Sequence, residues 1–405
     1  MSNRITRIET LRPLSRTSLI WVLVHTSDGV CGLGESWFGS ATVEADIHNR
    51  IAPLLLGENA SAIERINHLL RPYTGFCGSG AELRAASAID VALWDIAGQV
   101  ASRPICDLLG GRCRDAVDVY NTCAGPDYVS KASDVRPGNF GIDGGGQGTL
   151  EGTVYQDLDA FMHSADELAA SLMDMDIFSM KIWPFDFAAS AANGQTLSAQ
   201  EMSTALMPFE KIRKAHGDRM RIKAELHGLW TLPAAIDICR ALEPIAVDWV
   251  EDPLWMDRTH QLSTLAASTE LPLAGGETIG GLGQMHDLLN ASAISHPIVD
   301  VTWGGGITFA KKAATLAEAQ ALPIAFHDCS GPVTLTASTH LALACPNVRE
   351  QEITRAFYYG WYHNYVDTPP PIEKGKITIT GRPGLGMALQ ADVAERADVA
   401  VTVST

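Results

Sequence analysis

The pattern of apolar and polar positions changes near residue 116. Before that point, an apolar run at 18–26 has the length of a β-strand and is followed by turn residues. Further along, apolar residues across 82–100 recur at helical spacing. This mixture predicts a small α+β domain at the amino-terminal end of the chain.

After residue 116, short apolar stretches alternate with longer segments of helical periodicity. Strand, helix and strand repeated in this order predict parallel strands joined by crossover helices. Eight such stretches suffice for a closed α/β barrel ringed by helices, and a doubly wound open sheet is the alternative. The candidate strands are VDVYNTC (117–123), FSMKIW (178–183), RIKAEL (221–226), VDWVED (247–252), LPLAGGE (271–277), IVDVT (298–302), LPIAFHD (322–328) and NVREQEI (347–353).

Ionisable residues near the ends of the later strands favour the closed barrel. Successive members of this series are 23 to 27 residues apart, which is about one strand–helix unit. In a barrel the carboxyl ends of all strands converge on one face, where active sites lie. The series comprises Glu225, Glu251, Glu277, Asp300, His327 and Glu352.

Two segments fall outside the alternation. Residues 126–155 form a long irregular insertion, and loops of that length are usually functional lids or disordered. The tail from 366 contains a strand pattern at 376–380, which we expect to return to the amino-terminal domain. The predicted divisions are a capping domain at 1–115, a catalytic barrel at 116–355 and a returning segment at 356–405.

Composition and charge narrow the classes of partner. The 405 residues carry a formal charge of −17, which disfavours nucleic acid and anionic membranes, so we expect neither as a partner. The amino terminus lacks the apolar core of a signal peptide. The eight cysteines include no Cys-x-x-Cys pair, which favours reduced thiols and a cytoplasmic protein.

Three glutamates on consecutive strand ends offer an all-oxygen site. Glu225, Glu251 and Glu277 suit a hard divalent cation, and Mg²⁺ typically keeps waters that a substrate can displace. The alternative for each glutamate is a separate salt bridge at the barrel rim. Three glutamates in register with the strand–helix repeat favour the metal site.

Candidate proton-transfer groups flank these glutamates in strand order. Lys181 belongs to the second strand and His327 to the seventh, so they would lie on opposite sides of a metal-bound substrate. Asp300, on the sixth strand, could fix the tautomer of His327 and stabilise its charged form. A solvated lysine and a structural histidine are the alternatives for the two bases taken singly.

The stretch IKAELHGLW, at 222–230, places Lys223, Glu225 and His227 on one face of a strand. His227 should point into the same mouth, where it could bind substrate or supply an acid, although it could equally pack beneath a loop. Lys223 is predicted to lie deeper in the barrel, as an ion-pair partner of the three glutamates.

Several motifs in order along the chain resemble one family. The chain is similar to members of the enolase superfamily, in the mandelate racemase-like branch, over almost its full length. The motifs that carry the resemblance are AASAIDVALWDIAGQVASRPICDLLGG (85–111), WVEDPL (249–254), GGETIGG (275–281), DVTWGGGIT (300–308) and PGLGMAL (383–389).

The resemblance implies a modified (β/α)7β TIM barrel with an α+β capping domain built from both termini. It carries the magnesium ligands onto the three glutamates and the His–Asp dyad onto His327 and Asp300. A substrate-contacting acid falls on Glu352, or on Glu350 if the register slips by one inward position. The family's Lys-x-Lys reads Ser179-Met-Lys181 here, so the base is assigned to Lys181 and the role of the first lysine is open.

The family chemistry is removal of a proton next to a carboxylate with Mg²⁺ present. We expect a lowered pKa at Lys181, and dehydration of an aldonate or aldarate to a 2-keto-3-deoxy acid, as in carbohydrate catabolism. Racemisation, epimerisation or cycloisomerisation is the alternative within the class, and a non-catalytic ligand-binding barrel is the alternative outside it. Specificity is expected from capping loops at 13–20 and 72–80, with Arg16 and Tyr73 as substrate contacts, and we expect a homo-oligomer.

Overall fold

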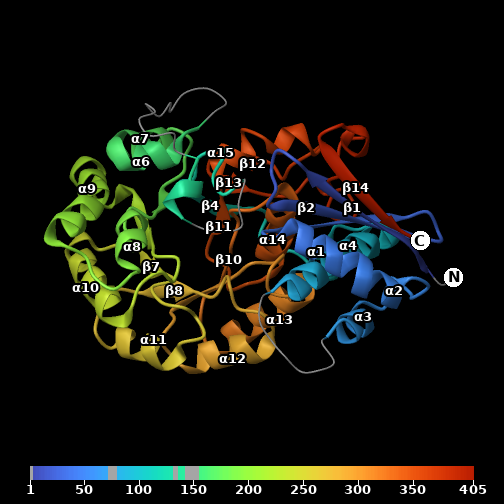
Figure 1. Cartoon of the computed structure of the whole chain (residues 1–405), viewed down its shortest axis with the longest axis horizontal. Helices are drawn as coiled ribbons and strands as arrows, with labels where there is room; N and C mark the ends of the chain where they lie inside the picture. The colour runs from blue at the N-terminus through green and yellow to red at the C-terminus, as the bar shows by residue number, and fades with distance from the viewer. Residues whose placement is uncertain (1–2, 72–79, 131–135, 142–154) are drawn as a thin grey trace.

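A computed structural model describes residues 3–71, 80–130, 136–141 and 155–405. Figure 1 shows an antiparallel sheet with its own helices packed beside a ring of helices that surrounds shorter strands. Tyr73 and most of the 126–155 insertion lie outside the described residues.

The capping sheet has the strand order β14-β1-β2-β3, and every neighbouring pair is antiparallel. Its strands are β1 (Ile5–Pro13), β2 (Leu19–Thr26), β3 (Cys31–Trp37) and β14 (Val399–Ser404). Both ends of the chain therefore contribute to it. The long helix α4 (Ala81–Ala101) confirms the helix predicted from apolar spacing and packs on β3. The smaller helices are α1 (Ser40–Asp46), a π-helical turn (Ile47–Ile51), α2 (Ala52–Leu55), α3 (Ile63–Leu69) and α5 (Ile105–Leu108).

Within the described residues, eight strands form the barrel, and they pair in parallel with their neighbours except between β10 and β11, which only an isolated parallel bridge joins. They are β4 (Val117–Thr122), β5 (Ser179–Ile182), β6 (Arg221–Glu225), β7 (Trp249–Glu251), β8 (Leu273–Gly275), β9 (His296–Val299), β10 (Ala325–Phe326) and β11 (Gln351–Ile353). The last strand, β11, pairs with the first, β4, and Ile324 bridges to Val348. This closure excludes the doubly wound open sheet.

Helices follow the first seven barrel strands, and β11 is followed by only a short turn of helix, α15 (Arg355–Tyr358), which gives the (β/α)7β order. They form the outer ring in Figure 1. The ring comprises α6 (Asp157–His163), α7 (Ala165–Met173), α8 (Asp186–Ala192), α9 (Ala199–His216), α10 (Leu232–Leu242), α11 (Thr259–Ala266), α12 (Leu282–Asn290), α13 (Gly306–Ala319) and α14 (Pro332–Ala344). Short 3-10 turns lie at Pro137–Asn139, Gly217–Arg219, Glu243–Ile245, Tyr362–Asn364 and Val393–Glu395.

The strand predicted at 376–380 does not join the capping sheet. β12 (Ile372–Glu373) and β13 (Lys376–Ile377) form a hairpin, and β13 pairs antiparallel with β4 of the barrel. The expectation was wrong for this strand, because the backbone N–H and C=O groups at the start of β4 are available to pair with β13. The segment that returns to the cap is β14.

Buried carboxylates of the capping domain hold the amino-terminal ends of barrel helices. Asp90 on α4 accepts hydrogen bonds from the Thr308 amide (3.0 Å) and hydroxyl (2.6 Å) near the start of α13. A Cβ at Gly306 would lie 2.1 Å from Asp90, and Gly306 has φ of +80°, so glycine is required there. These contacts give the motifs around Asp90 and Gly306 a structural reason.

Glu35 on β3 binds the start of α14 in the same way, through the Thr334 amide (2.9 Å) and hydroxyl (2.7 Å) and the Val333 amide (3.4 Å). Trp21 donates a further hydrogen bond of 2.9 Å. Burial raises the pKa of Glu35 to about 7, although the hydrogen bonds oppose that shift. The carboxyl is therefore a protonation site at the junction of the two domains.

Comparison of the wild-type protein with Glu35→Gln should show the effect of this protonation on the free energy of unfolding. Between pH 7 and 4.5 the native protein binds a proton at Glu35 that the unfolded chain does not, so wild-type stability rises relative to Glu35→Gln as pH falls. The expected change in the difference is roughly 3 kcal/mol across that window. Urea unfolding of both proteins from pH 4.5 to 7.5 measures it, and a difference independent of pH would contradict the prediction.

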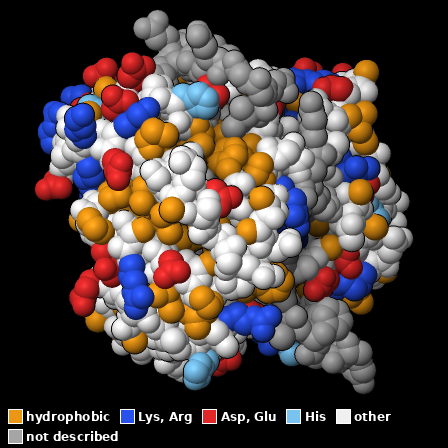
Figure 2. Space-filling view, turned by 60° about the vertical axis from the view of Figure 1, so that its left-hand side comes forward, with side chains coloured by type: hydrophobic (Ala, Val, Ile, Leu, Met, Phe, Trp, Pro, Cys, Tyr) orange, Lys and Arg blue, Asp and Glu red, His pale blue; other side chains and the backbone are white. Residues whose placement is uncertain are grey.

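Figure 2 shows acidic and basic side chains interspersed on one face, without a continuous basic area. Within the described ranges, no helix combines the length and apolarity that crossing a bilayer requires.

Candidate active site

Three glutamates converge at the carboxyl ends of adjacent barrel strands. Glu225 and Glu251 end β6 and β7 and are paired in the strand register, while Glu277 follows β8 by two residues. One carboxylate oxygen from each lies within 4.8 Å of those of the others, and all three side chains are buried. Buried carboxylates at this separation repel one another and require positive charge nearby.

Lys181 on β5 supplies positive charge in this structure. Its ammonium nitrogen lies 2.5 Å from Glu251, 3.2 Å from Glu225 and 3.0 Å from Glu352. Burial lowers the pKa of Lys181, but the three carboxylates raise it further, so the net pKa is well above the ordinary value. The expectation of a lowered pKa was wrong here, because the contacting groups are anionic rather than cationic.

The glutamate triad fits a divalent cation. One oxygen of Glu225 is buried without a hydrogen-bond partner and lies 3.2 Å from the Lys181 ammonium. Burial and the neighbouring carboxylates hold the pKa of Glu251 well above its usual range, which is the response to an excess of negative charge. A donor set made only of carboxylate oxygens is the kind that hard divalent cations bind.

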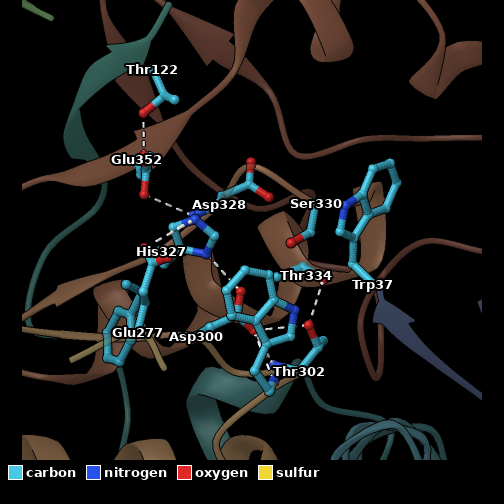
Figure 3. Close-up of polar contacts among 12 residues, drawn as sticks. Trp37, Thr122, Glu277, Asp300, Thr302, His327, Asp328, Ser330, Thr334 and Glu352 are labelled. Carbon is cyan, nitrogen blue, oxygen red and sulfur yellow. Dashed lines mark hydrogen bonds and ion pairs between the residues drawn. The ribbon is translucent and has the colours of Figure 1, made fainter. Parts of the chain in front are cut away.

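A histidine–aspartate pair lies next to the triad. His327, just after β10, has Nδ1 2.7 Å from Asp300 and Nε2 3.3 Å from Glu277, as Figure 3 shows. The other oxygen of Asp300 accepts hydrogen bonds from the Thr302 amide and hydroxyl and the Trp303 amide, at 2.7 to 2.9 Å. Burial lowers the pKa of His327, but Glu277, Glu352 and Asp300 raise it well above its ordinary value. The ring is therefore fixed and favours its protonated form.

A second histidine–aspartate pair lies on the β6 side of the cavity. His227 Nδ1 is 2.7 Å from Asp186 at the start of α8, and burial, outweighed by Asp186 and Glu225, leaves its pKa raised to about 9. β6 ends at Glu225, so His227 stands in a turn rather than on the predicted strand face, with φ of +48°. Its side chain still reaches the cavity.

The candidate catalytic groups border a small cavity beneath the capping domain. Its lining includes Lys181, Glu225, His227, Glu277 and His327, together with aromatic side chains and Phe38 of the cap. The cavity volume is about 30 Å³, which is space for little more than one water molecule. A larger ligand enters only when lining side chains move apart.

Three residues that line this cavity have a strained backbone. Phe38, Val129 and His227 all line it and have φ of +69°, +43° and +48°, a conformation that is costly for residues with side chains. Such strain persists only where the surrounding structure holds it, and it is common at functional sites.

The other candidates for substrate contact have different surroundings. Arg16 donates to the Pro126 carbonyl at 2.9 Å and lies over the Trp361 ring at 4.3 Å, so its guanidinium is engaged with the start of the insertion. Glu352 binds Thr122, Lys181 and the Asp328 amide, and it lies beside the triad. Glu350 instead binds Arg221 at 2.8 Å, away from the triad.

Lys223 does not pair with the glutamate triad, so that prediction was wrong. Its ammonium contacts the Ser179 hydroxyl, Glu350 at 2.9 Å and Asp248 at 3.1 Å. It sits one inward layer below Glu225, over the ring of Trp249 at 4.3 Å. The indole of Trp249 donates to Glu251 at 2.8 Å and so separates Lys223 from the triad.

Sequence reasoning missed three contributors to the site. Asp186 lies 41 residues before His227, so no local spacing indicates the pair. Trp303 carries no signal in the sequence beyond its place in the motif DVTWGGGIT, yet its ring lies 4.8 Å from that of His327. The guanidinium of Arg84, on α4, lies 4.5 Å from the centre of the Trp303 ring. The position of Arg84 near the start of a helix gives no signal in the sequence that would indicate this contact.

A closed parallel barrel with a lysine, buried carboxylates and histidine–aspartate pairs at its C-terminal face is typical of barrel enzymes that act by proton transfer. Two family models match the chain: enolase C-terminal domain-like over residues 164–393, and the mandelate racemase / muconate lactonizing enzyme N-terminal domain over residues 8–110. The chain belongs to the enolase superfamily, in its mandelate racemase-like branch, as its motifs indicated.

Known proteins resemble the chain over nearly its whole length. It is 28% identical to a D-xylonate dehydratase of Haloferax volcanii, across 96% of this chain and 88% of that protein. It is 30% identical to a D-galactonate dehydratase of Ralstonia nicotianae, across 97% and 94%. The crystal structure of an enolase of the mandelate racemase subgroup from Agrobacterium tumefaciens is 41% identical, with a TM-score of 0.87 and coverage of 99% and 98%.

Proposed function

We propose that this protein is a Mg²⁺-dependent dehydratase that converts an acid sugar, an aldonate or aldarate, into a 2-keto-3-deoxy acid. The observation that carries the proposal is the placement of Lys181 and the His327–Asp300 pair around the glutamate triad. Relatives of similar length bear the names D-xylonate dehydratase and D-galactonate dehydratase, which supports this class of substrate.

Glu225, Glu251 and Glu277 would hold the cation. When bound, Mg²⁺ supplies positive charge that offsets the carboxylate field on Lys181 and stabilises negative charge developing on the substrate carboxylate. The all-oxygen donor set supports this assignment, as does the buried oxygen of Glu225 that has an ion pair with Lys181 but no hydrogen bond.

Lys181, as a neutral amine, takes the proton from the carbon next to the substrate carboxylate. The bond between the next carbon and its hydroxyl oxygen then breaks, and His327 donates a proton so that the hydroxyl leaves as water. The enol that remains tautomerises to the 2-keto acid. Asp300 holds Nδ1 of His327, which leaves Nε2 directed toward Glu277 and the cavity.

His227 and Glu352 complete the reacting end of the site. His227, held by Asp186, lines the cavity on the β6 side, where it binds the substrate or supplies a second acid. Glu352 lies 3.0 Å from Lys181 and positions its amine.

Epimerisation is the second candidate function, because proton-transfer groups border the cavity from different strands. If no leaving group departs, a base on the opposite side can return a proton to the same carbon with inversion. Cycloisomerisation would share the first proton transfer.

Screening acid sugars with Mg²⁺ and a carbonyl reagent tests the proposal. We expect a 2-keto product from at least one aldonate or aldarate, and loss of the product on chelation by EDTA. Incorporation of solvent deuterium at carbon 2 without a keto product would indicate epimerisation. No product and no exchange across the panel, from protein that binds Mg²⁺, would count against both functions.

A further inference from the structure

Part of the catalytic cavity wall is aromatic and carries polar hydrogens without partners. Tyr128, Trp183 and Trp303 all line the cavity, and they are 3%, 1% and 5% exposed. The Tyr128 hydroxyl and the indole nitrogens of both tryptophans are buried and have no hydrogen-bond partner. Buried donors left unpaired are costly, and their presence in a cavity indicates a ligand that accepts hydrogen bonds there.

These groups lie beside the two histidines of the site. The Tyr128 and Trp183 rings are 5.2 Å apart, and Trp183 is 5.7 Å from His227. Across the barrel, Trp303 lies 4.8 Å from His327 and 5.5 Å from Phe38 of the cap. The donors therefore lie on two sides of the cavity, where the part of a bound acid sugar that extends past the two histidines would meet them.

The three donor side chains in the cavity lining should bind a neutral substrate tail better than a negatively charged one. Indole nitrogens are donors only, and burial holds the pKa of the Tyr128 hydroxyl well above its usual range, so this hydroxyl stays neutral. Among the described residues that line the cavity, the cationic or basic groups are Lys181, His227 and His327, all at the reacting end. A second carboxylate packed against these donors would meet no further cation among the described lining residues, because Arg84 lies behind the Trp303 ring at 4.5 Å and not in the lining, so its burial there is unfavourable.

We propose that Tyr128, Trp183 and Trp303 recognise the hydroxyl groups of a neutral sugar tail, so that the substrate is an aldonate rather than an aldarate. This inference rests on the proposed function and narrows it to monocarboxylic acid sugars. A site built to hydrogen-bond substrate hydroxyls discriminates strongly against analogues that lack them.

A matched pair of substrates tests the class. An aldonate and the aldarate of the same configuration differ only at the terminal carbon, which is a primary alcohol in one and a carboxylate in the other. We expect kcat/KM for the aldonate to exceed that for the aldarate by at least about 100-fold, the ratio expected when a polar site leaves groups unpaired. The inference would be overturned if the enzyme turned over the aldarate faster than the aldonate and the variant Arg84→Gln lost this preference for the aldarate. That result would show that Arg84, behind the Trp303 ring, binds the substrate tail.

Single-donor variants test the residues. Tyr128→Phe and Trp183→Phe each remove one hydrogen-bonding group and keep an aromatic ring. Each should lower kcat/KM for the aldonate about tenfold more than for glycerate, which keeps the reacting carbons and lacks the tail. The control is Trp255→Phe, because Trp255 is 64% exposed; it should show no such difference.

Failures of the two hypotheses are distinguishable. Equal losses on the aldonate and on glycerate would show that these residues shape the site generally, which would overturn the recognition of the tail while dehydration stands. Absence of dehydration from every aldonate, every aldarate and glycerate would overturn the proposed function together with this inference.

Discussion

Lys181→Met should reduce both dehydration and exchange of the substrate's carbon-2 proton by about 10³-fold, the range that a general base contributes. The amine lies within 3.2 Å of Glu225, Glu251 and Glu352, where it can reach a carboxylate substrate at the triad. Methionine keeps roughly the length of the side chain and removes the amine, and with it the positive charge beside the three carboxylates.

His327→Asn should separate the two reactions. Loss of the acid should reduce dehydration by a similar factor, because the hydroxyl then leaves without a proton, while Lys181 still exchanges the carbon-2 proton. Mass spectrometry of recovered substrate in deuterated water measures exchange, and a carbonyl reagent measures the keto product. Exchange that survives in Lys181→Met and disappears in His227→Gln would move the role of base to His227.

Mg²⁺ at 100 times its Kd should stabilise the wild-type protein by about 2.7 kcal/mol, and Glu251→Gln should lose most of that gain together with catalysis. Glu251 is one of three carboxylates whose oxygens lie within 4.8 Å of each other, so its replacement removes a third of the site's charge. Lys181 keeps Glu225 and Glu352 as partners in this variant, which allows the fold to persist without the cation.

Glu350→Gln is the matched control for the cation prediction. Glu350 is an equally buried carboxylate of the barrel, but it binds Arg221 and Lys223 below the site. This variant should be less stable than wild type without metal and should keep the full increment on addition of Mg²⁺. Thermal unfolding with and without Mg²⁺ compares the proteins, and an equal increment in Glu251→Gln would remove Glu251 from the cation site.

The sequence determined the fold class and the convergence of the acidic residues. Strand–helix alternation predicted a parallel barrel, and the regular spacing of Glu225, Glu251 and Glu277 placed all three at one end of it. These predictions succeed because a barrel strand has a fixed direction, so a residue at its carboxyl end must lie on the catalytic face. The link between His327 and Asp300 follows from adjacent strands in the same way.

Only the tertiary structure decided which cationic side chain pairs with which carboxylate. Lys223 was expected to contact the triad, but one inward layer separates them and Trp249 lies between. Lys181 has a raised rather than lowered pKa because three carboxylates from three other strands surround it. Asp186 reaches His227 from a helix, and the aromatic residues with unpaired donors line the cavity from separate loops. Periodicity fixes the face on which a side chain lies, whereas its partners depend on the layer it reaches and on loops whose paths no local pattern specifies.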